Sequence, residues 1–159
     1  MTRSSTVHNH PRLSLLTATV MLGLLALLHF GSPQAIRAQS PAPVVLASGQ
    51  FVEIDGLHKG EGKALVVVLP DGQRFLRFED FKVTNGPDLY VYLSGHTAPR
   101  DKAQLHQGAA FEIGLLKGNI GNQNYALPAD LDLSKFKSVA VYCKRFSVIF
   151  STAALVFRR

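Results

Sequence analysis

Cysteine is nearly absent from this chain of 159 residues, in which Cys143 is the only one. A single cysteine cannot form an intrachain disulfide, and it cannot supply both thiols of a dithiol redox centre. The C-x-x-C-H sequence that attaches haem covalently is absent as well. Thiol chemistry at Cys143 would therefore have to be intermolecular, proceed through a sulfenic acid, or use a cofactor that is held noncovalently.

Methionine and histidine are missing from the positions that a copper site would need. A blue-copper site combines one cysteine with two histidines, usually together with an axial methionine. Neither residue type follows Cys143, and both methionines, Met1 and Met21, precede residue 39. The histidines beyond that point have no metal-ligand spacing; they are His58, His96 and His106. The sequence therefore predicts no metal site.

Signatures of common enzymes are also absent. No Ser-His-Asp order, pair of carboxylates or phosphate-binding loop stands out, so the sequence favours a protein without enzymatic activity. The 17 Lys and Arg residues outnumber the 11 Asp and Glu residues. However, Arg3, Arg12 and Arg37 lie before residue 39, and the other basic residues are scattered without forming a run. A nucleic-acid partner is therefore not expected.

A long apolar stretch is present near the N-terminus, where Leu13 to Phe30 contains no Asp, Glu, Lys or Arg. Basic residues precede it and small residues up to Ala38 follow it, which indicates a secretory signal peptide over residues 1–38. The stretch is longer than most signal-peptide cores, so an uncleaved membrane-anchor helix is the alternative. In both cases we expect the rest of the chain to be extracytoplasmic, either periplasmic or secreted. Membrane attachment is expected only if the segment is retained.

Strand patterns dominate residues 49–157, after a short tether rich in Pro, Ala and Ser at residues 39–48. The valine-rich stretch from Lys63 to Leu69 is typical of a strand that is buried on both faces. Pro70-Asp71-Gly72 follows and predicts a hairpin turn, because proline presets φ and glycine permits a positive φ. We therefore expect an all-β domain, either an antiparallel β-sandwich or a barrel-like sheet, preceded by the apolar signal or anchor helix.

Two polar segments are candidates for functional contacts. The first is a predicted turn made of Asn85, Gly86, Pro87 and Asp88. The Asp88 carboxylate would order this turn by accepting hydrogen bonds from backbone N–H groups. The second is a loop that would either contact a ligand or satisfy its own backbone groups, and the latter interpretation is favoured. Its candidate contact residues are Lys117, Asn119, Asn122, Gln123, Asn124 and Tyr125. A further irregular excursion is expected from Gly95 to Gly108.

The apolar pattern changes phase just after the cysteine. Apolar side chains occupy alternate positions up to Cys143, but from Phe146 to Phe150 they occupy the positions of opposite phase. A straight strand with one buried face cannot do this, because its side-chain period is two. A bulge, a tight turn or a corner between sheets is therefore expected at Lys144-Arg145. Cys143 would be the last inward-facing residue before this break, so we expect it to be less deeply buried than a cysteine in the middle of a strand. Lys144 and Arg145 would favour the thiolate form of Cys143 if their side chains reach the sulfur.

Three segments of the chain form a distinctive series: FEDFKVTNGPDLYVYLS, IGLLKGNIGNQNYALP and SVAVYCKRFSVIFSTAAL. They resemble the signature blocks of the DM-thirteen domain, which is often labelled an electron-transfer domain, and His58 with Gly62 resembles that family's early His-then-Gly feature. The resemblance extends from about Gly49 to Phe157. It implies a β-rich extracytoplasmic domain with a proposed redox role for the family's cysteine, which corresponds to Cys143. Because no second domain accompanies this one in the chain, it also implies that a redox partner protein would be a separate molecule.

Two hypotheses for the function remain open. In the first, the domain is an exported electron-transfer or redox-associated module in which Cys143 is a free thiol or a noncovalent haem ligand. His58 would then be an acceptor or a second haem ligand. In the second, the domain is an extracytoplasmic binding or adhesion module in which Cys143 only packs the core, as free cysteines often do. Its contact surface would be the loop at residues 117–125 together with the excursion from Gly95 to Gly108.

Overall fold

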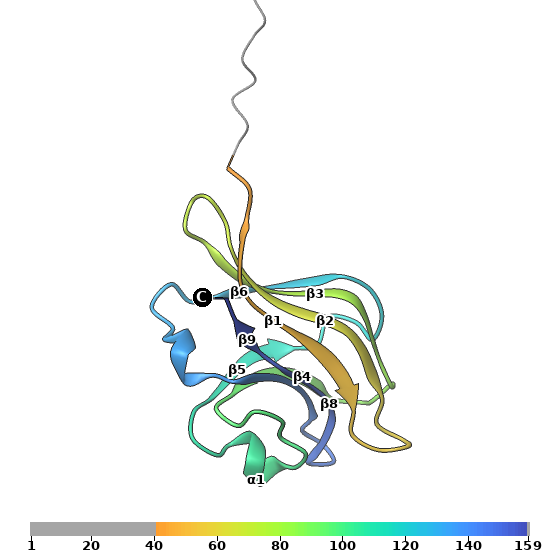
Figure 1. Ribbon diagram of the computed structural model, residues 1–159. Helices are drawn as coiled ribbons and strands as arrows, with labels where there is room; N and C mark the ends of the chain where they lie inside the picture. Colours follow the sequence, from red (N-terminus) through yellow and green to blue (C-terminus); the bar gives the residue numbers. More distant parts are fainter. Residues whose placement is uncertain (1–40, 159) are drawn as a thin grey trace, which may run out of the picture. The chain divides into compact units, whose positions relative to one another are not determined.

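A nearly closed, barrel-like β-sheet makes up the part of the chain that the computed structural model describes, residues 41–158 (Figure 1). The predicted leader lies outside the described residues, and no helix within them has the length and apolar character needed to cross a membrane. The strands are β1 (Val44–Glu53), β2 (Gly60–Val68), β3 (Arg74–Val83), β4 (Leu89–Ser94), β5 (Ala110–Leu115), β6 (Gln123–Leu127), β7 (Ser138–Cys143), β8 (Val148–Ala154) and β9 (Val156–Phe157). The helical elements are short: α1 (Lys102–Leu105) and the 3-10 turn η1 (Leu133–Lys135).

The strands follow one another in the sheet in the order β5-β4-β7-β8-β1-β2-β3-β6, and β9 pairs with β1. All of these pairings are antiparallel. The strands at the two ends of this order, β5 and β6, are consecutive in the chain. The sheet curls into a barrel-like form, and one loop joins its two end strands. The predicted all-β antiparallel class is confirmed, and of the two predicted architectures the barrel-like one is correct.

The β2–β3 hairpin has the turn that the sequence predicts. The Leu69 N–H donates a 2.8 Å hydrogen bond to the Gln73 carbonyl, and Gly72 adopts a φ of 84°. The valine-rich strand is buried mainly on one face, since Val66 is fully buried whereas Leu65 is partly exposed. Burial on both faces is therefore only partly correct, because Leu65 lines an open groove on the outer side of the sheet.

The interior of the sheet is filled by a large apolar cluster. Three of its phenylalanines, Phe51, Phe78 and Phe81, pack ring against ring with centroids 4.8 to 4.9 Å apart. β7 lies between β4 and β8, and its inward-facing residues are fully buried in this cluster. Cys143 is the last of them.

The outer side of β7 is buried as well. The excursion from Gly95 to Gly108 connects β4 to β5, and a bridge between Asp101 and Val148 joins it to β8. From this excursion α1, seen at the lower end of the barrel in Figure 1, contributes the fully buried Leu105 to a second apolar cluster. The other buried members of this cluster are Ile54, Tyr92, Ala140, Tyr142 and Ile149. β7 is therefore enclosed from both sides.

The change of phase after Cys143 is a tight turn, one of the three predicted alternatives. The turn spans residues 144–147 and leads directly into β8. A bulge at Phe150 also shifts the register of the β7–β8 pair. The expectation that Cys143 is less deeply sealed than a mid-strand cysteine is wrong, since the residue is 0% exposed. The reason is that β7 is a central strand, so that its last residue is flanked by β4 and β8 and covered by the interior cluster.

Candidate functional site

Cys143 occupies the last paired position of β7, opposite Leu89 of β4 and Val148 of β8. Its thiol is free and fully buried. Lys144, the next residue, places its ammonium on the opposite side of the sheet, 2.8 Å from a Glu112 carboxylate oxygen. Lys144 is therefore engaged with a carboxylate and does not stabilise a thiolate at Cys143.

His58 lies in the β1–β2 loop. Its Nδ1 is 2.9 and 2.8 Å from the two carboxylate oxygens of Asp55, and its ring packs edge-on against Phe150 with centroids 4.6 Å apart. Hydrogen bonds from the His58 side chain and from the backbone N–H groups of His58 and Leu57 lower the pKa of Asp55 to about 2. The Phe150 ring packs against His58 and also belongs to the interior cluster that contains Cys143. The two predicted redox residues are not hydrogen-bonded to each other.

The turn predicted at residues 85–88 joins β3 to β4 near the same aromatic ring. A Cβ atom on Gly86 would lie 2.8 Å from the Leu89 side chain and 2.9 Å from the Phe150 ring, so the backbone packs directly on both. The Asp88 carbonyl accepts a 3.0 Å hydrogen bond from the N–H of Lys144, the first residue of the β7–β8 turn. The two turns and the side chains beneath them therefore pack together at the end of the barrel where Cys143 is buried.

The polar loop between β5 and β6 bonds mainly to itself. The Tyr125 hydroxyl donates to Gln123 Oε1 at 2.5 Å and accepts from the Lys117 N–H at 3.0 Å. The Gln123 amide donates to a carbonyl of the same loop at 2.6 Å, and the Lys117 ammonium donates to the Asn124 carbonyl at 2.5 Å. The other two predicted contact residues bond to backbone groups in or just after β3; they are Asn119 and Asn122. These contacts favour the interpretation in which the loop satisfies its own polar groups.

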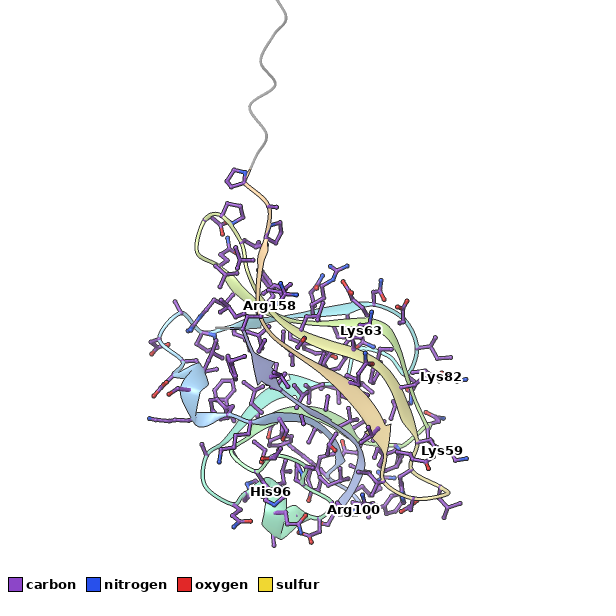
Figure 2. The ribbon with its side chains drawn as sticks, in the orientation of Figure 1. Lys59, Lys63, Lys82, His96, Arg100 and Arg158 are labelled. Carbon is purple, nitrogen blue, oxygen red and sulfur yellow. The ribbon has the colours of Figure 1, made fainter. Side chains whose placement is uncertain are left out.

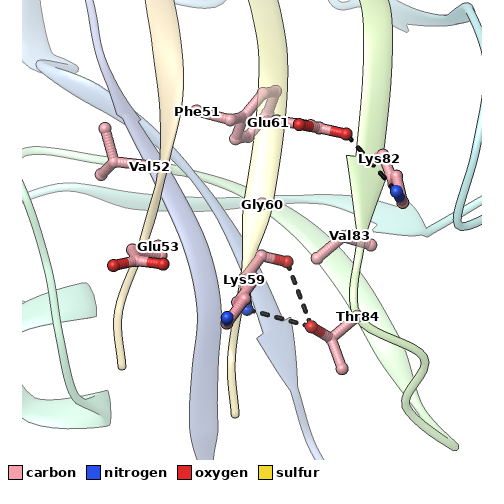
Figure 3. A pocket seen from close by; sticks show the side chains of 9 residues that line it. All are labelled: Phe51, Val52, Glu53, Lys59, Gly60, Glu61, Lys82, Val83 and Thr84. Carbon is pink, nitrogen blue, oxygen red and sulfur yellow. Dashed lines mark hydrogen bonds and ion pairs between the residues drawn. The ribbon is translucent and has the colours of Figure 1, made fainter. Parts of the chain in front are cut away.

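A surface groove of about 540 Å³ lies where β1, β2 and β3 meet the loops at their ends (Figure 3). It is lined by Phe51, Val52, Glu53, Lys59, Gly60, Glu61, Lys82, Val83 and Thr84. Lys59 and Lys82 project from this side of the sheet (Figure 2). Lys82 forms an exposed ion pair with Glu61 at 3.7 Å, and the Thr84 hydroxyl accepts from the Lys59 N–H at 3.0 Å. The sequence predicts none of these residues as a site, because three separate strands must pair before the groove exists.

A second polar group of side chains, not predicted from the sequence, lies on the outer side of β4, β5 and β7. The Tyr92 hydroxyl donates a 2.5 Å hydrogen bond to one oxygen of Glu112, and the Lys144 ammonium donates to the other at 2.8 Å. The Lys144 ammonium also lies 3.6 Å from the centroid of the Tyr90 ring, and the rings of Tyr92 and Tyr142 meet edge to face at 5.8 Å. We call these five residues the tyrosine cluster. The alternating tyrosines of LYVYLS are its only signal in the sequence, because the other members come from β5, from β7 and from the β7–β8 turn.

Hydrogen bonds set the charge states within the tyrosine cluster. The bonds from Lys144 and Tyr92 lower the pKa of Glu112, so its carboxylate is ionised at neutral pH. Burial raises the pKa of Tyr92 and the hydrogen bond to Glu112 raises it further, so the phenol keeps its proton. Tyr92 is only 6% exposed, whereas the side chains of Glu112 and Lys144 are 40% and 35% exposed. The cluster therefore joins a buried phenol to a carboxylate that reaches solvent.

The described residues present no group arranged to hold a metal ion, and Cys143 is not accessible as a haem ligand. Within residues 41–158, no group of three or more His, Cys, Asp or Glu side chains is placed to hold a metal ion. Haem ligation by Cys143 does not fit the described conformation, because the residue has no exposed surface that an iron atom could approach.

Comparison with known families links this domain to electron transfer. A family model described as Electron transfer DM13 matches residues 50–155, from within β1 to the end of β8, and the matched region includes Cys143 and His58. This is the family that the three quoted sequence segments resemble. The comparisons with curated proteins and with solved structures find no significant match.

Proposed function

Because the chain belongs to the electron transfer DM13 family, we propose that it is an exported electron-transfer module in which Cys143 is the redox-active residue. The family match is the observation that carries the association with electron transfer. The assignment to Cys143 is supported by its being the chain's only thiol and by its place within the matched region. A single thiolate can be oxidised by two electrons in either of two ways. A peroxide converts it to a sulfenic acid and is reduced to water or an alcohol, or the thiolate attacks a disulfide of a separate partner protein, which forms a mixed disulfide and releases one thiol of the partner.

Access to the sulfur is the main physical requirement of this proposal. Cys143 is fully buried, but it is the last residue of its strand, and the next turn exposes Arg145 and Phe146. Opening the end of a hairpin breaks fewer contacts than opening the middle of a sheet. We therefore expect the thiol to react through local opening of the β7–β8 turn, more slowly than a surface thiol reacts.

A thiol titration combined with a visible absorption spectrum tests the proposal on protein isolated from its own compartment. We expect one reactive thiol per chain under native conditions, and the spectrum shows whether the isolated protein carries a coloured cofactor. The double variant Cys143→Ala/Arg145→Cys is a matched control, because it places a thiol on the exposed turn and gives the rate without burial. A colourless protein whose Cys143 reacts only after denaturation would refute the redox role.

A binding or adhesion module is the second candidate, and the complete burial of Cys143 is the observation that favours it. In that case Cys143 only packs the core, and partners contact the excursion from Gly95 to Gly108 or the loop at residues 117–125. We then expect Cys143→Ala to lower thermal stability without changing partner capture. Loss of electron exchange in a Cys143→Ala variant that remains folded would exclude this candidate.

Export is part of the proposal and is supported by the leader pattern before residue 39. Cell fractionation followed by N-terminal sequencing tests it directly. Cleavage after Ala38 leaves Gln39 as the first residue, whereas an intact N-terminus in the membrane fraction indicates the anchored form.

A further inference from the structure

The tyrosine cluster supports a second redox site on the side of β7 opposite Cys143. We propose that Tyr92 is a one-electron redox residue whose hydroxyl proton passes to Glu112 when the phenol is oxidised. The inference rests on the proposed electron-transfer function, but it does not require Cys143 to react.

The geometry provides a proton acceptor at the reacting atom. A phenol that loses an electron becomes a strong acid, so oxidation is easiest where a base already accepts a hydrogen bond from the hydroxyl. The Tyr92 oxygen lies 2.5 Å from Glu112 Oε2, which is within the range for direct proton transfer. Holding donor and acceptor in this position removes the need to organise a solvent base at the moment of oxidation.

Lys144 and solvent complete the proton pathway. The ammonium of Lys144, 2.8 Å from the second oxygen of Glu112, keeps the carboxylate ionised and therefore ready to accept a proton. Because the Glu112 side chain is 40% exposed, it can afterwards release the proton to water. The buried phenol is thus connected to solvent through one partly exposed carboxylate.

The step balances in protons and electrons. A one-electron oxidant, such as a metal-centred electron carrier, takes one electron from the Tyr92 phenol and is itself reduced. The Oη–H bond of Tyr92 breaks, an O–H bond forms at Glu112 Oε2, and Tyr92 becomes a neutral phenoxyl radical. A one-electron reductant reverses the step and returns the proton to the phenol.

Aromatic side chains provide a short route for the electron. The Tyr92 ring lies 5.8 Å from that of Tyr142 and 6.1 Å from that of His106, measured between centroids. His106 is exposed just after α1. A carrier at this surface could therefore exchange an electron with Tyr92 although Tyr92 itself is 6% exposed.

Tyr92 differs from the chain's three other tyrosines, all of which the structure describes. The Lys144 ammonium lies over the ring of Tyr90, where its positive charge opposes the loss of an electron. The Tyr125 hydroxyl donates to a neutral amide rather than to a carboxylate. Among the hydrogen bonds of residues 41–158, Tyr92 alone of the tyrosines donates to a carboxylate.

Oxidation of the full-length chain by hexachloroiridate(IV) tests the proposal. The Cys143→Ala background prevents the thiol from consuming the oxidant. Freeze-quenched samples should show a tyrosyl radical by electron paramagnetic resonance. The signal should disappear in Tyr92→Phe and persist in the control Tyr125→Phe, which removes a phenol outside the tyrosine cluster. Stopped-flow absorption should show that Glu112→Gln slows the oxidation about 100-fold, the effect of removing a positioned proton acceptor.

Two further measurements separate a redox role from a structural one. Glu112→Asp keeps the charge but lengthens the contact, so it should slow the oxidation less than Glu112→Gln. The oxidation should also be slower in D₂O than in H₂O for the parent, and the size of this isotope effect should change in Glu112→Gln, where the proton must pass to water. Thermal unfolding of each variant confirms that it is folded at the assay temperature.

The proposal is wrong if folded Tyr92→Phe gives the parent radical signal, or if Glu112→Gln is oxidised at the parent rate. These outcomes are independent of the thiol assay described above. A reactive Cys143 without a Tyr92 radical would overturn this inference and leave the thiol function standing. A Tyr92 radical with an inert Cys143 would support this inference and refute the role of the thiol.

Discussion

Cys143 and Tyr142 are neighbours in the chain, yet they belong to opposite and chemically different sides of β7. Cys143 faces the interior of the barrel, where its cluster is apolar and the residue is 0% exposed. Tyr142 faces the outer cluster, where its ring meets Tyr92 and where Glu112 and Lys144 reach solvent. The two sides therefore place different limits on the redox chemistry proposed above. The thiol is limited by access to its sulfur, and the phenol already has a proton acceptor.

Phe150 is a buried aromatic residue of the interior cluster, and of the substitutions proposed for the two sides of β7 its replacement should have the largest effect on stability. We expect Phe150→Ala to destabilise the fold by about 3–5 kcal/mol, because it empties a buried aromatic site. It should also accelerate the reaction of the native protein with a thiol reagent, since the ring belongs to the cluster around Cys143 and contacts Gly86 and His58. Urea unfolding and thiol-reagent kinetics on the same samples measure both effects.

Phe146→Ala is the matched control for that experiment, because Phe146 is 61% exposed in the turn between β7 and β8. A surface substitution of this kind usually changes stability by less than about 0.5 kcal/mol. Equal acceleration of the thiol reaction by Phe146→Ala and Phe150→Ala would show that the turn itself, and not the packing beneath it, controls access.

The outer side depends on Leu105, which α1 contributes to the second cluster with 0% exposure. Leu105→Ala should destabilise the fold by about 3 kcal/mol. Because Leu105 packs with the outer residues of β4 and β7, amide hydrogen exchange should accelerate in the excursion from Gly95 to Gly108. The thiol rate of Cys143 should stay near that of the parent. The exposed Leu115 provides the control Leu115→Ala, and a thiol rate that rises with Leu105→Ala would contradict the independence of the two sides.

These two regions also show which features local sequence patterns can predict. The strands and the turn at Pro70-Asp71-Gly72 were predicted because alternation and turn residues act over a few positions. The phase change at Lys144-Arg145 was predicted for the same reason. The complete burial of Cys143 was not predicted, because it depends on β4 and β8 lying on either side of β7. The contact of Tyr92 with Glu112 likewise requires β4 and β5 to pair in one register, which periodicity does not specify.

Gly86 provides a smaller and more local change on the inner side. A Cβ at this position would meet the Leu89 side chain at 2.8 Å and the Phe150 ring at 2.9 Å. Gly86→Ala should therefore destabilise the fold by about 1–3 kcal/mol through overpacking, and thiol kinetics should accelerate as the turn at residues 85–88 is displaced. Gly56→Ala is the control, since a Cβ there has no neighbour within 4 Å. Equal stability of the two variants in urea would show that the contact at Gly86 relaxes without loss.

The smallest expected effect concerns Asp55, which fixes His58 against Phe150. Hydrogen bonds from His58 and Leu57 lower the pKa of Asp55 from 3.8 to about 2 in the folded protein. A carboxyl group with a lowered folded-state pKa stabilises the fold at pH values above its unfolded-state pKa, and this contribution is lost as the pH falls. Asp55→Asn should therefore lower Tm slightly at pH 5, and the difference from the parent should shrink between pH 3.8 and about 2. Thermal melts across this pH range measure the effect, with Asp71→Asn in the β2–β3 turn as the control. A difference in Tm that is constant with pH would mean that Asp55 acts through packing and not through its charge.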